Sequence, residues 1–227
     1  MTLIEVIDSA RALLNEPLAA ARTFPDDTSS FWTDTILAKY FNMAQQELQH
    51  EIIQTFEDDF VTQSYLSIVN GTAEYTLPSQ TIKVRRVEDN RDVAAPVEIV
   101  PVTLNNRGGI VHYVHCSTFV GGGYYIRGNQ IVLTDTPTFT NASAIRVHFL
   151  KALADVTAGS NTSELPEGCT RCLIWGIVKL ALFQQQSDTT IANAEYQNHL
   201  TKIQKQGEDR QIQRPRKVVE AHSRGVI

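Results

Sequence analysis

The spacing of apolar residues changes twice along the chain, and this change constrains the fold more than any other feature. Before about residue 58 and after Pro166, apolar residues recur every three or four positions, which predicts amphipathic helices. Between these regions, short segments rich in β-branched and aromatic residues are separated by turn residues, which predicts antiparallel strands. We therefore expect an α+β fold: a helical bundle from the N- and C-terminal helices, with an inserted antiparallel β sandwich or barrel module.

Four helices are expected. Thr2 caps the first, whose apolar residues repeat at helical spacing: Leu3, Ile7, Ala10, Leu14 and Leu18. Thr33 or Asp34 caps the second, which has the clearest apolar stripe: Leu37, Tyr40, Phe41, Ala44, Leu48, Ile52 and Phe56. The third follows Pro166 and is apolar on most sides. Ser187 or Asp188 caps the fourth, whose inward residues are Ala192, Tyr196, Leu200 and Ile203.

The strand-rich region is divided by turn signals. Asn70-Gly71 is the strongest short hairpin signal, and Gly128-Asn129 predicts a second tight turn. Strands are expected at 60–69, 74–77, 82–88, 97–100, 111–115, 123–127, 130–134 and 144–150. The expected domains are N-terminal helices at 1–58, the β module at 59–155, C-terminal helices of the same bundle at 164–212, and an extended basic tail at 213–227.

The stretch GGGYYIRGNQIVLTDTP, residues 121–137, raises the possibility of a phosphate-binding loop. Gly121 and Gly123 fit a dinucleotide-binding pattern, but Ile126 stands where the third glycine is needed. A strand follows instead of a helix, so no helix N-terminus is available to hold a phosphate. We interpret the stretch as two strands joined by the Gly128-Asn129 turn, with no cofactor.

The three cysteines do not suggest a disulfide framework. Cys169 and Cys172 have the spacing of metal ligands, and with His112, His115 and Cys116 they could form a zinc site. A zinc knuckle usually places such a pair on a turn, whereas Cys169 and Cys172 lie on the apolar stripe of the third predicted helix. Small buried cysteines are common there, so we expect structural thiols and no metal.

No catalytic motif is recognisable. The six histidines match none, and the run Glu57-Asp58-Asp59 is typical of a solvated helix end. We therefore expect no catalytic residues and no enzyme. The alternative from a different class is a zinc- or magnesium-dependent nucleic-acid-processing enzyme that uses scattered carboxylates.

The charge is unevenly distributed. The whole chain carries −5, and residues 201–227 hold seven basic and three acidic residues, so the tail carries +4 and the rest carries −9. An acidic body is not typical of a nucleic-acid-binding protein. No aromatic residue is interleaved with the charges of the tail, so it offers no stacking on bases. Ordering on a protein partner is at least as well supported as binding nucleic acid.

We expect no secretory signal and no membrane span. The N-terminus lacks a basic and an apolar region. The longest apolar segment, residues 172–183, contains Lys179 and is far shorter than the roughly 20 residues that a span needs. We therefore expect a soluble chain.

Several segments resemble the head-to-tail adaptor (connector) proteins of short-tailed bacteriophages. FWTDTILAKYFNMAQQEL, residues 31–48, is similar to the family's aromatic-rich helix start, and YTLP followed by IKVRRV, residues 75–87, is similar to its next β segment. Residues 125–137 resemble the pattern Y-x-i-x-G-n-x-i-x-L-x-P-x-P, with Asp135 in place of the first proline. Weaker likenesses lie at 145–150, 165–167 and 188–196, so the resemblance covers about residues 30–205.

The resemblance implies a structural virion protein, made in the cytoplasm of a bacterial host, that acts at the head–tail junction. It implies a homo-oligomeric ring, commonly twelvefold, that docks on the portal protein. Such a ring extends the channel for double-stranded genomic DNA and provides the platform for tail proteins. The C-terminal segment of such proteins often contacts the portal, which implies portal-docking roles for Arg210, Arg214, Pro215, Arg216 and Lys217. Another phage neck or tail-completion protein is the nearest alternative.

Overall fold

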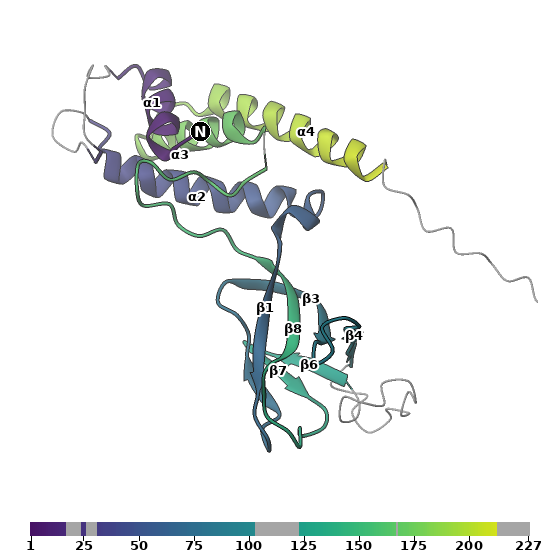
Figure 1. The fold of residues 1–227 in the computed structure, drawn as a ribbon. Coiled ribbons are helices and arrows are strands. Elements are labelled where there is room, and N and C mark those ends of the chain that lie inside the picture. Colours follow the sequence, from purple (N-terminus) through teal and green to yellow (C-terminus); the bar gives the residue numbers. More distant parts are fainter. Residues whose placement is uncertain (17–23, 26–30, 103–122, 167, 213–227) are drawn as a thin grey trace, which may run out of the picture. The chain divides into compact units, whose positions relative to one another are not determined.

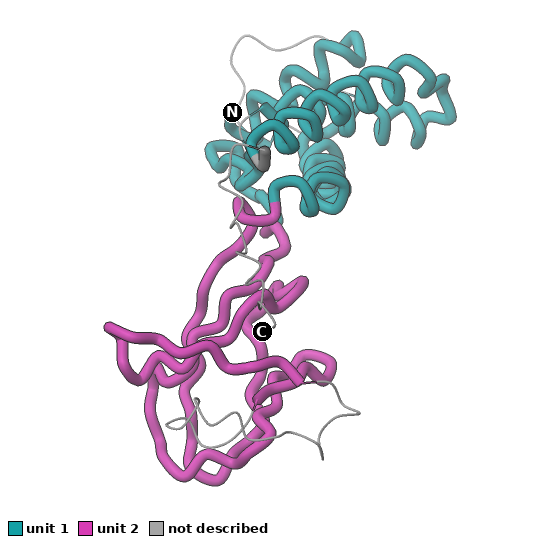
Figure 2. The backbone as a smooth tube through the Cα atoms, turned by 90° about the vertical axis from the view of Figure 1, so that its right-hand side faces the viewer, with its two compact units in different colours: residues 1–56, 155–227 teal, residues 57–154 magenta. Residues whose placement is uncertain are grey.

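The computed structural model describes residues 1–16, 24–25, 31–102, 123–166 and 168–212 (Figure 1). The chain divides into two compact units (Figure 2). Unit 1 is built from residues 1–56 and 155–227, and unit 2 from residues 57–154. The described part of unit 1 is helical, and that of unit 2 contains two four-stranded sheets, so the predicted α+β class is confirmed.

Unit 1 contains four helices: α1 Leu3–Leu13, α2 Asp34–Ile52, α3 Thr170–Gln184 and α4 Thr190–Ile212. The caps predicted for α1 and α2 are confirmed, whereas α4 begins at Thr190, two residues after Asp188. Thr2 and Glu5 form a capping box, and the Thr33 hydroxyl accepts a hydrogen bond from the backbone of Ile36 at 3.2 Å. Before α4, hydrogen bonds from the side chain and the backbone of Thr190 lower the pKa of Asp188, and the backbone N–H donates to the Asp188 carboxylate at 2.8 Å.

The first helix ends earlier than its apolar pattern predicts. Leu14 is its C-cap, Asn15 adopts a left-handed φ of 59°, and Leu18 lies outside the described residues. The backbone N–H of Glu16 bonds to the carbonyl of Arg11 at 3.0 Å, and that of Asn15 bonds to Ala12 at 3.3 Å. These two bonds form a Schellman motif with asparagine in the position usually held by glycine, and they end the helix.

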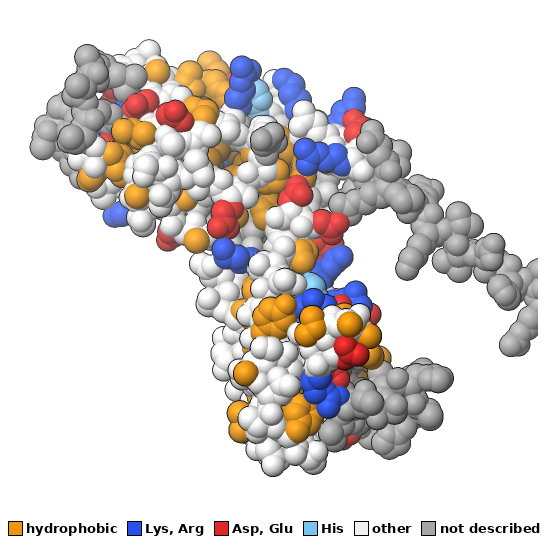
Figure 3. Space-filling model, in the orientation of Figure 1, with side chains coloured by type: hydrophobic (Ala, Val, Ile, Leu, Met, Phe, Trp, Pro, Cys, Tyr) orange, Lys and Arg blue, Asp and Glu red, His pale blue; other side chains and the backbone are white. Residues whose placement is uncertain are grey.

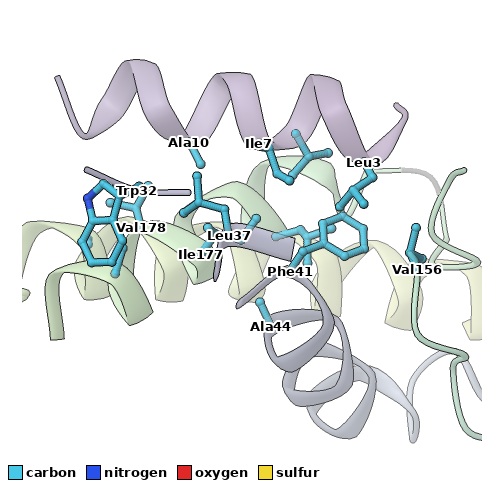
Figure 4. Close-up of a cluster of buried hydrophobic side chains, with 14 residues drawn as sticks. Leu3, Ile7, Ala10, Trp32, Leu37, Phe41, Ala44, Val156, Ile177 and Val178 are labelled. Atoms are coloured by element: carbon cyan, nitrogen blue, oxygen red, sulfur yellow. The ribbon is translucent and has the colours of Figure 1, made fainter. Parts of the chain in front are cut away.

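The helices before and after the inserted unit share one hydrophobic core (Figure 4). Side chains of α1 face those of α2 and α3 in the close-up view, and its labelled residues include Leu3, Ile7, Ala10, Leu37, Phe41, Ala44 and Ile177. Gly176 permits close packing in α3, because a Cβ added there would lie 3.1 Å from that of Ala44. The predicted bundle is therefore confirmed.

Unit 2 begins with the short 3₁₀ helix η1, Glu57–Phe60. One sheet has the order β1-β8-β3-β4: β1 Val61–Ile68, β8 Asn141–Lys151, β3 Thr81–Asp89 and β4 Val97–Glu98. The second has the order β2-β7-β6-β5: β2 Glu74–Thr76, β7 Gln130–Leu133, β6 Gly123–Arg127 and β5 Val100–Pro101. All pairs are antiparallel except β5 with β6.

The two sheets bury a common cluster, which makes unit 2 a sandwich. Val87, Ile145 and Val147 come from the first sheet, and Tyr75 and Ile131 come from the second. The described strands do not close into a barrel. The sandwich form of the predicted module is therefore the one observed.

Two strand predictions need correction. The hairpin predicted at Asn70-Gly71 is wrong, because β1 pairs with β8 and β2 pairs with β7 in the other sheet. The turn itself forms, with a φ of 81° at Gly71, but it carries the chain between sheets. The strand predicted at 97–100 is split at buried Ile99, where the chain passes from β4 to β5. The strand predicted at 111–115 lies outside the described residues.

Asn42 of α2 binds the chain where it re-enters unit 1. Its amide nitrogen donates to the carbonyl of Val156 at 3.2 Å, and its amide oxygen accepts from the Val156 N–H at 2.8 Å. These two hydrogen bonds satisfy both backbone groups of Val156, as a neighbouring strand would in a β bridge, but they come from one side chain. Further along, the carbonyls of Gly159 and Asn161 accept from Ile4 and Leu3, two of the N–H groups that begin α1.

Replacing Asn42 with alanine leaves the N–H and carbonyl of Val156 without this partner. We expect the Asn42→Ala variant to lose about 1–3 kcal/mol in the free energy of unfolding, measured with urea. Gln46→Ala is the matched control, since Gln46 bonds exposed Asp155 at 3.1 Å and its loss should cost less than about 0.5 kcal/mol. Equal losses in the two variants would contradict the role of Asn42.

Candidate functional site

The glycine-rich stretch forms part of the second sheet. The N–H of Gly123 donates to the Thr134 hydroxyl at 2.9 Å, so it is not free for a phosphate. A Cβ at Gly123 would lie 2.5 Å from the carbonyl oxygen of Val100, which explains why glycine stands where β5 meets β6. Arg127 faces Gln130 across the predicted Gly128-Asn129 turn, which is confirmed. Gly121 and Gly122 lie outside the described residues.

Cys169 and Cys172 are buried at the start of α3. The thiol of Cys172 contacts the backbone carbonyl of Tyr196 at 3.6 Å, and burial raises the pKa of Cys172 to about 12. Its thiol is therefore neutral near pH 7. The other residues of the possible zinc site, His112, His115 and Cys116, lie outside the described residues. Within the described part, His, Cys, Asp and Glu form no group of three or more that could hold a metal ion.

Glu88 is the centre of a charged network on β3 and β8. Arg146 Nε lies 2.7 Å and His148 Nε2 lies 3.2 Å from Glu88 Oε2, and Arg86 Nε lies 2.9 Å from Glu88 Oε1. The register sets Glu88 opposite Arg146 and Arg86 opposite His148. These side chains alternate with core residues such as Val147, so they occupy the other face of the sheet.

The network explains the protonation state of its carboxylate. Burial favours a higher pKa for Glu88, but hydrogen bonds from His148 and Arg146 and the charge of Arg86 outweigh burial and hold the pKa below its ordinary value. Glu88 is therefore ionised at neutral pH and pairs with the guanidinium groups of Arg86 and Arg146. A carboxylate in this state is a poor proton donor, so the network is suited to holding β3 and β8 together.

Ionic contacts around Glu57 and around Arg11 were also not predicted from the sequence. Glu57, in the run taken as a solvated helix end, pairs with Lys83 at 3.7 Å and with Arg85. In unit 1, buried Arg11 pairs with Asp34 at 2.9 Å and with Glu16 at 2.6 Å. The spacing i, i+4, i+8 of Leu3, Ile7 and Arg11 is the signal that places Arg11 on the buried side.

A groove of about 630 Å³ lies in unit 2 beside β3 and β6. Its walls include Ile82, Val84, Tyr124 and Ile126, and Lys83 is the one charged side chain among the described residues that line it. Burial raises the pKa of Tyr124, so its hydroxyl is protonated. The groove thus offers a mixed polar and apolar surface, and the described residues that line it include no grouping of acid and base for catalysis.

The end of α4 holds the described part of the predicted portal-docking segment. The guanidinium carbon of Arg210 lies 5.6 Å from the centre of the Phe56 ring, within the range of a cation–π contact. Arg214, Pro215, Arg216 and Lys217 lie outside the described residues, so their predicted role stays a prediction. On the face shown in Figure 3, acidic and basic side chains are interspersed over each unit. Among the described helices, none is long and apolar enough to cross a membrane.

A comparison with protein families decides the class of the protein. The family described as SU10 adaptor protein matches residues 1–219. The chain belongs to the SU10 adaptor protein family. A comparison with curated proteins gave no match. The SU10 adaptor family is one of structural phage adaptors, so the resemblance to phage head-to-tail adaptors is confirmed. Membership implies association with portal and tail in the virion, at the head–tail junction.

The Glu88 network gives the SU10 family member a specific pH dependence. Because the folded pKa of Glu88 is lowered, its contribution is present above the pKa of the unfolded carboxyl and is lost as pH falls through the folded pKa. We expect Glu88→Gln to lower the free energy of unfolding by about 2 kcal/mol at pH 7 and by progressively less at acidic pH. Urea unfolding at several pH values measures this.

Glu98→Gln is the matched control. Glu98 also contacts Arg86, at 3.4 Å, but it is 54% exposed. Its substitution should cost less than about 0.5 kcal/mol at every pH. If the free energy of unfolding changed with pH in the same way for the wild type and for Glu88→Gln, the proposed stabilising role of ionised Glu88 would be contradicted.

Burial of Cys172 predicts slow alkylation. With iodoacetamide at pH 8, Cys172 should be modified in urea but not in the native protein, because its thiolate is scarce and covered. Peptide mass spectrometry measures this. Stoichiometric zinc, together with alkylation of native Cys172 after a chelator is added, would restore the metal-site hypothesis.

Proposed function

We propose that this adaptor is a structural ring protein of the head–tail junction, made in the host cytoplasm. Its copies form a homo-oligomeric ring, twelvefold as the resemblance implies, that docks on the portal and provides the platform for tail proteins. The match to the SU10 adaptor family over residues 1–219 is the observation that carries this proposal. It covers all four helices and both sheets of the described structure.

The charge distribution supports a role around DNA without sequence recognition. Residues 1–200 together carry −9. An acidic lumen would not hold the phosphates of double-stranded DNA, so the genome could slide through, whereas a basic wall would bind it. We propose that the ring extends the DNA channel in this way.

A non-enzymatic role is consistent with the described side chains. The carboxylate of Glu88 is surrounded by Arg86, Arg146 and His148, and the thiol of Cys172 is protonated at neutral pH. Neither provides the free nucleophile or general base that catalysis needs. We assign the protein no catalytic residues, no cofactor and no metal.

We propose that the C-terminal segment docks the adaptor on the portal. Residues 201–227 carry +4, while the rest of the chain is acidic. Arg210, in the last turn of α4, contacts Phe56 of its own unit. The docking role is therefore assigned chiefly to Arg214, Arg216 and Lys217. Pro215 restricts the backbone conformation between Arg214 and Arg216.

Truncation after Gln211 tests the docking role. We expect the truncated protein to keep its helical circular dichroism and melting temperature, since the core residues of both units precede the cut. It should no longer co-elute with the portal protein of the same phage. Co-elution of the truncated protein would contradict docking by the tail, and no co-elution of the full chain would contradict the adaptor proposal in this form.

A charge-matched comparison separates docking from general electrostatics. Replacing Arg214, Arg216 and Lys217 with glutamine should weaken portal binding about tenfold, the effect of three ion pairs at about 0.5 kcal/mol each. Lys202→Gln with Lys205→Gln alters exposed charges on α4 and should leave binding near that of wild type. Equal weakening by both sets would indicate that only net charge matters.

A further inference from the structure

Strand β1 forms one edge of the first sheet and lacks the features that usually keep an edge strand from pairing. It is eight residues long, and among the described strands it pairs with β8 alone. Its sequence, VTQSYLSI, contains no Lys, Arg, Asp, Glu or Pro. Natural edge strands are commonly kept from pairing by short length, charge or proline, because their free N–H and C=O groups accept any extended chain.

The other described sheet edges do have such features. β4 is two residues long and includes Glu98, whose carboxylate lies 3.4 Å from Arg86. β5 is two residues long and includes Pro101. β2 is three residues long, and its Glu74 pairs with Arg127 at 2.6 Å. Among the edges that the structure describes, β1 therefore stands apart in both length and composition.

The backbone of β1 is suited to one more strand. In an antiparallel pair, alternate residues bond the neighbour, and those between direct their N–H and C=O groups the other way. The register with β8 is regular from Val61 to Leu66 and shifts before Ile68. Along this stretch Gln63 and Tyr65 are exposed, and Tyr65 is 46% exposed on the face opposite the core. A partner strand of about six residues could pair there without disturbing the sandwich.

We propose that the open edge of β1 takes a strand from a second copy of the chain, so that the sheet continues across the boundary between subunits. The inference rests on the proposed ring. Each copy carries a net charge of −5, whereas β1 presents eight consecutive uncharged residues, so pairing along β1 places none of its own charges against another copy. A closed ring needs contacts between two different surfaces, so the strand taken from the neighbour is not its β1.

Hydrogen exchange on the wild-type protein tests the proposal first. In the isolated subunit, every second amide of residues 61–66 faces away from β8 and should exchange quickly. In the assembled state, with portal present if assembly needs it, all of these amides should exchange slowly. Unchanged exchange in an assembled ring would overturn the inference and leave the proposed function standing. A wild-type protein that never assembles, even with portal, would overturn both.

Two proline variants give a matched pair. Gln63 and Ser64 are adjacent, so the N–H of one bonds β8 and that of the other faces the open edge. Gln63→Pro and Ser64→Pro should therefore differ: one loses the β1–β8 ladder and melts early, and the other keeps the wild-type melting temperature. The stable variant should need about tenfold more protein for half-assembly, as expected for one lost backbone hydrogen bond per contact.

Mass measurement of the stable proline variant completes the test. Assembly at wild-type concentrations would contradict pairing through β1. Slow exchange of β1 amides in a complex that holds a single copy of the chain bound to portal would assign the edge to a portal strand, and it would also overturn the second-copy proposal.

Discussion

The hydrogen bonds between Asn42 and the backbone of Val156 hold the chain at the point where it returns to the helical unit. The rest of the structure depends on this return, because α1 and α2 share a core with α3 and α4 across an insertion that spans residues 57–154. Closing a long flexible loop costs conformational entropy. Here the inserted unit brings its own ends together, since β1 is its first strand, β8 is its last, and Val61 lies opposite Leu150.

Local patterns predicted most of the secondary structure. The change of period located the bundle and the sandwich, and the caps at Thr2 and Thr33 depend on side chains within a few residues of the helix starts. The prediction of a hairpin at Asn70-Gly71 was wrong for a physical reason. A turn signal specifies a reversal of the chain but not which strands pair, and burial of Ile68 and Tyr75 in a shared core is satisfied with the two strands in different sheets.

The charged network around Glu88 was beyond local prediction. Its members lie on β3 and β8, and more than fifty residues separate Glu88 from Arg146 and His148. A register shift of one residue would place these side chains on the other face. The sequence alone contains no local signal for that register. Local context argued against a phosphate loop, and the structure adds a reason in the bonded amide of Gly123. The zinc hypothesis stays untested, because His112, His115 and Cys116 lie outside the described residues.

The proposed function rests on the family match and on the charge distribution, because the described residues form no catalytic or metal-binding site. The central claim is that copies of this chain close into a ring on the portal. Native mass spectrometry of the purified adaptor–portal complex tests it most directly by counting adaptor copies per portal. The account predicts a single defined stoichiometry, twelve adaptor copies per portal as the resemblance implies. At saturating adaptor concentration, no complexes with fewer copies should be detected. A complex with one or two adaptor copies per portal, or no complex at all, would contradict it.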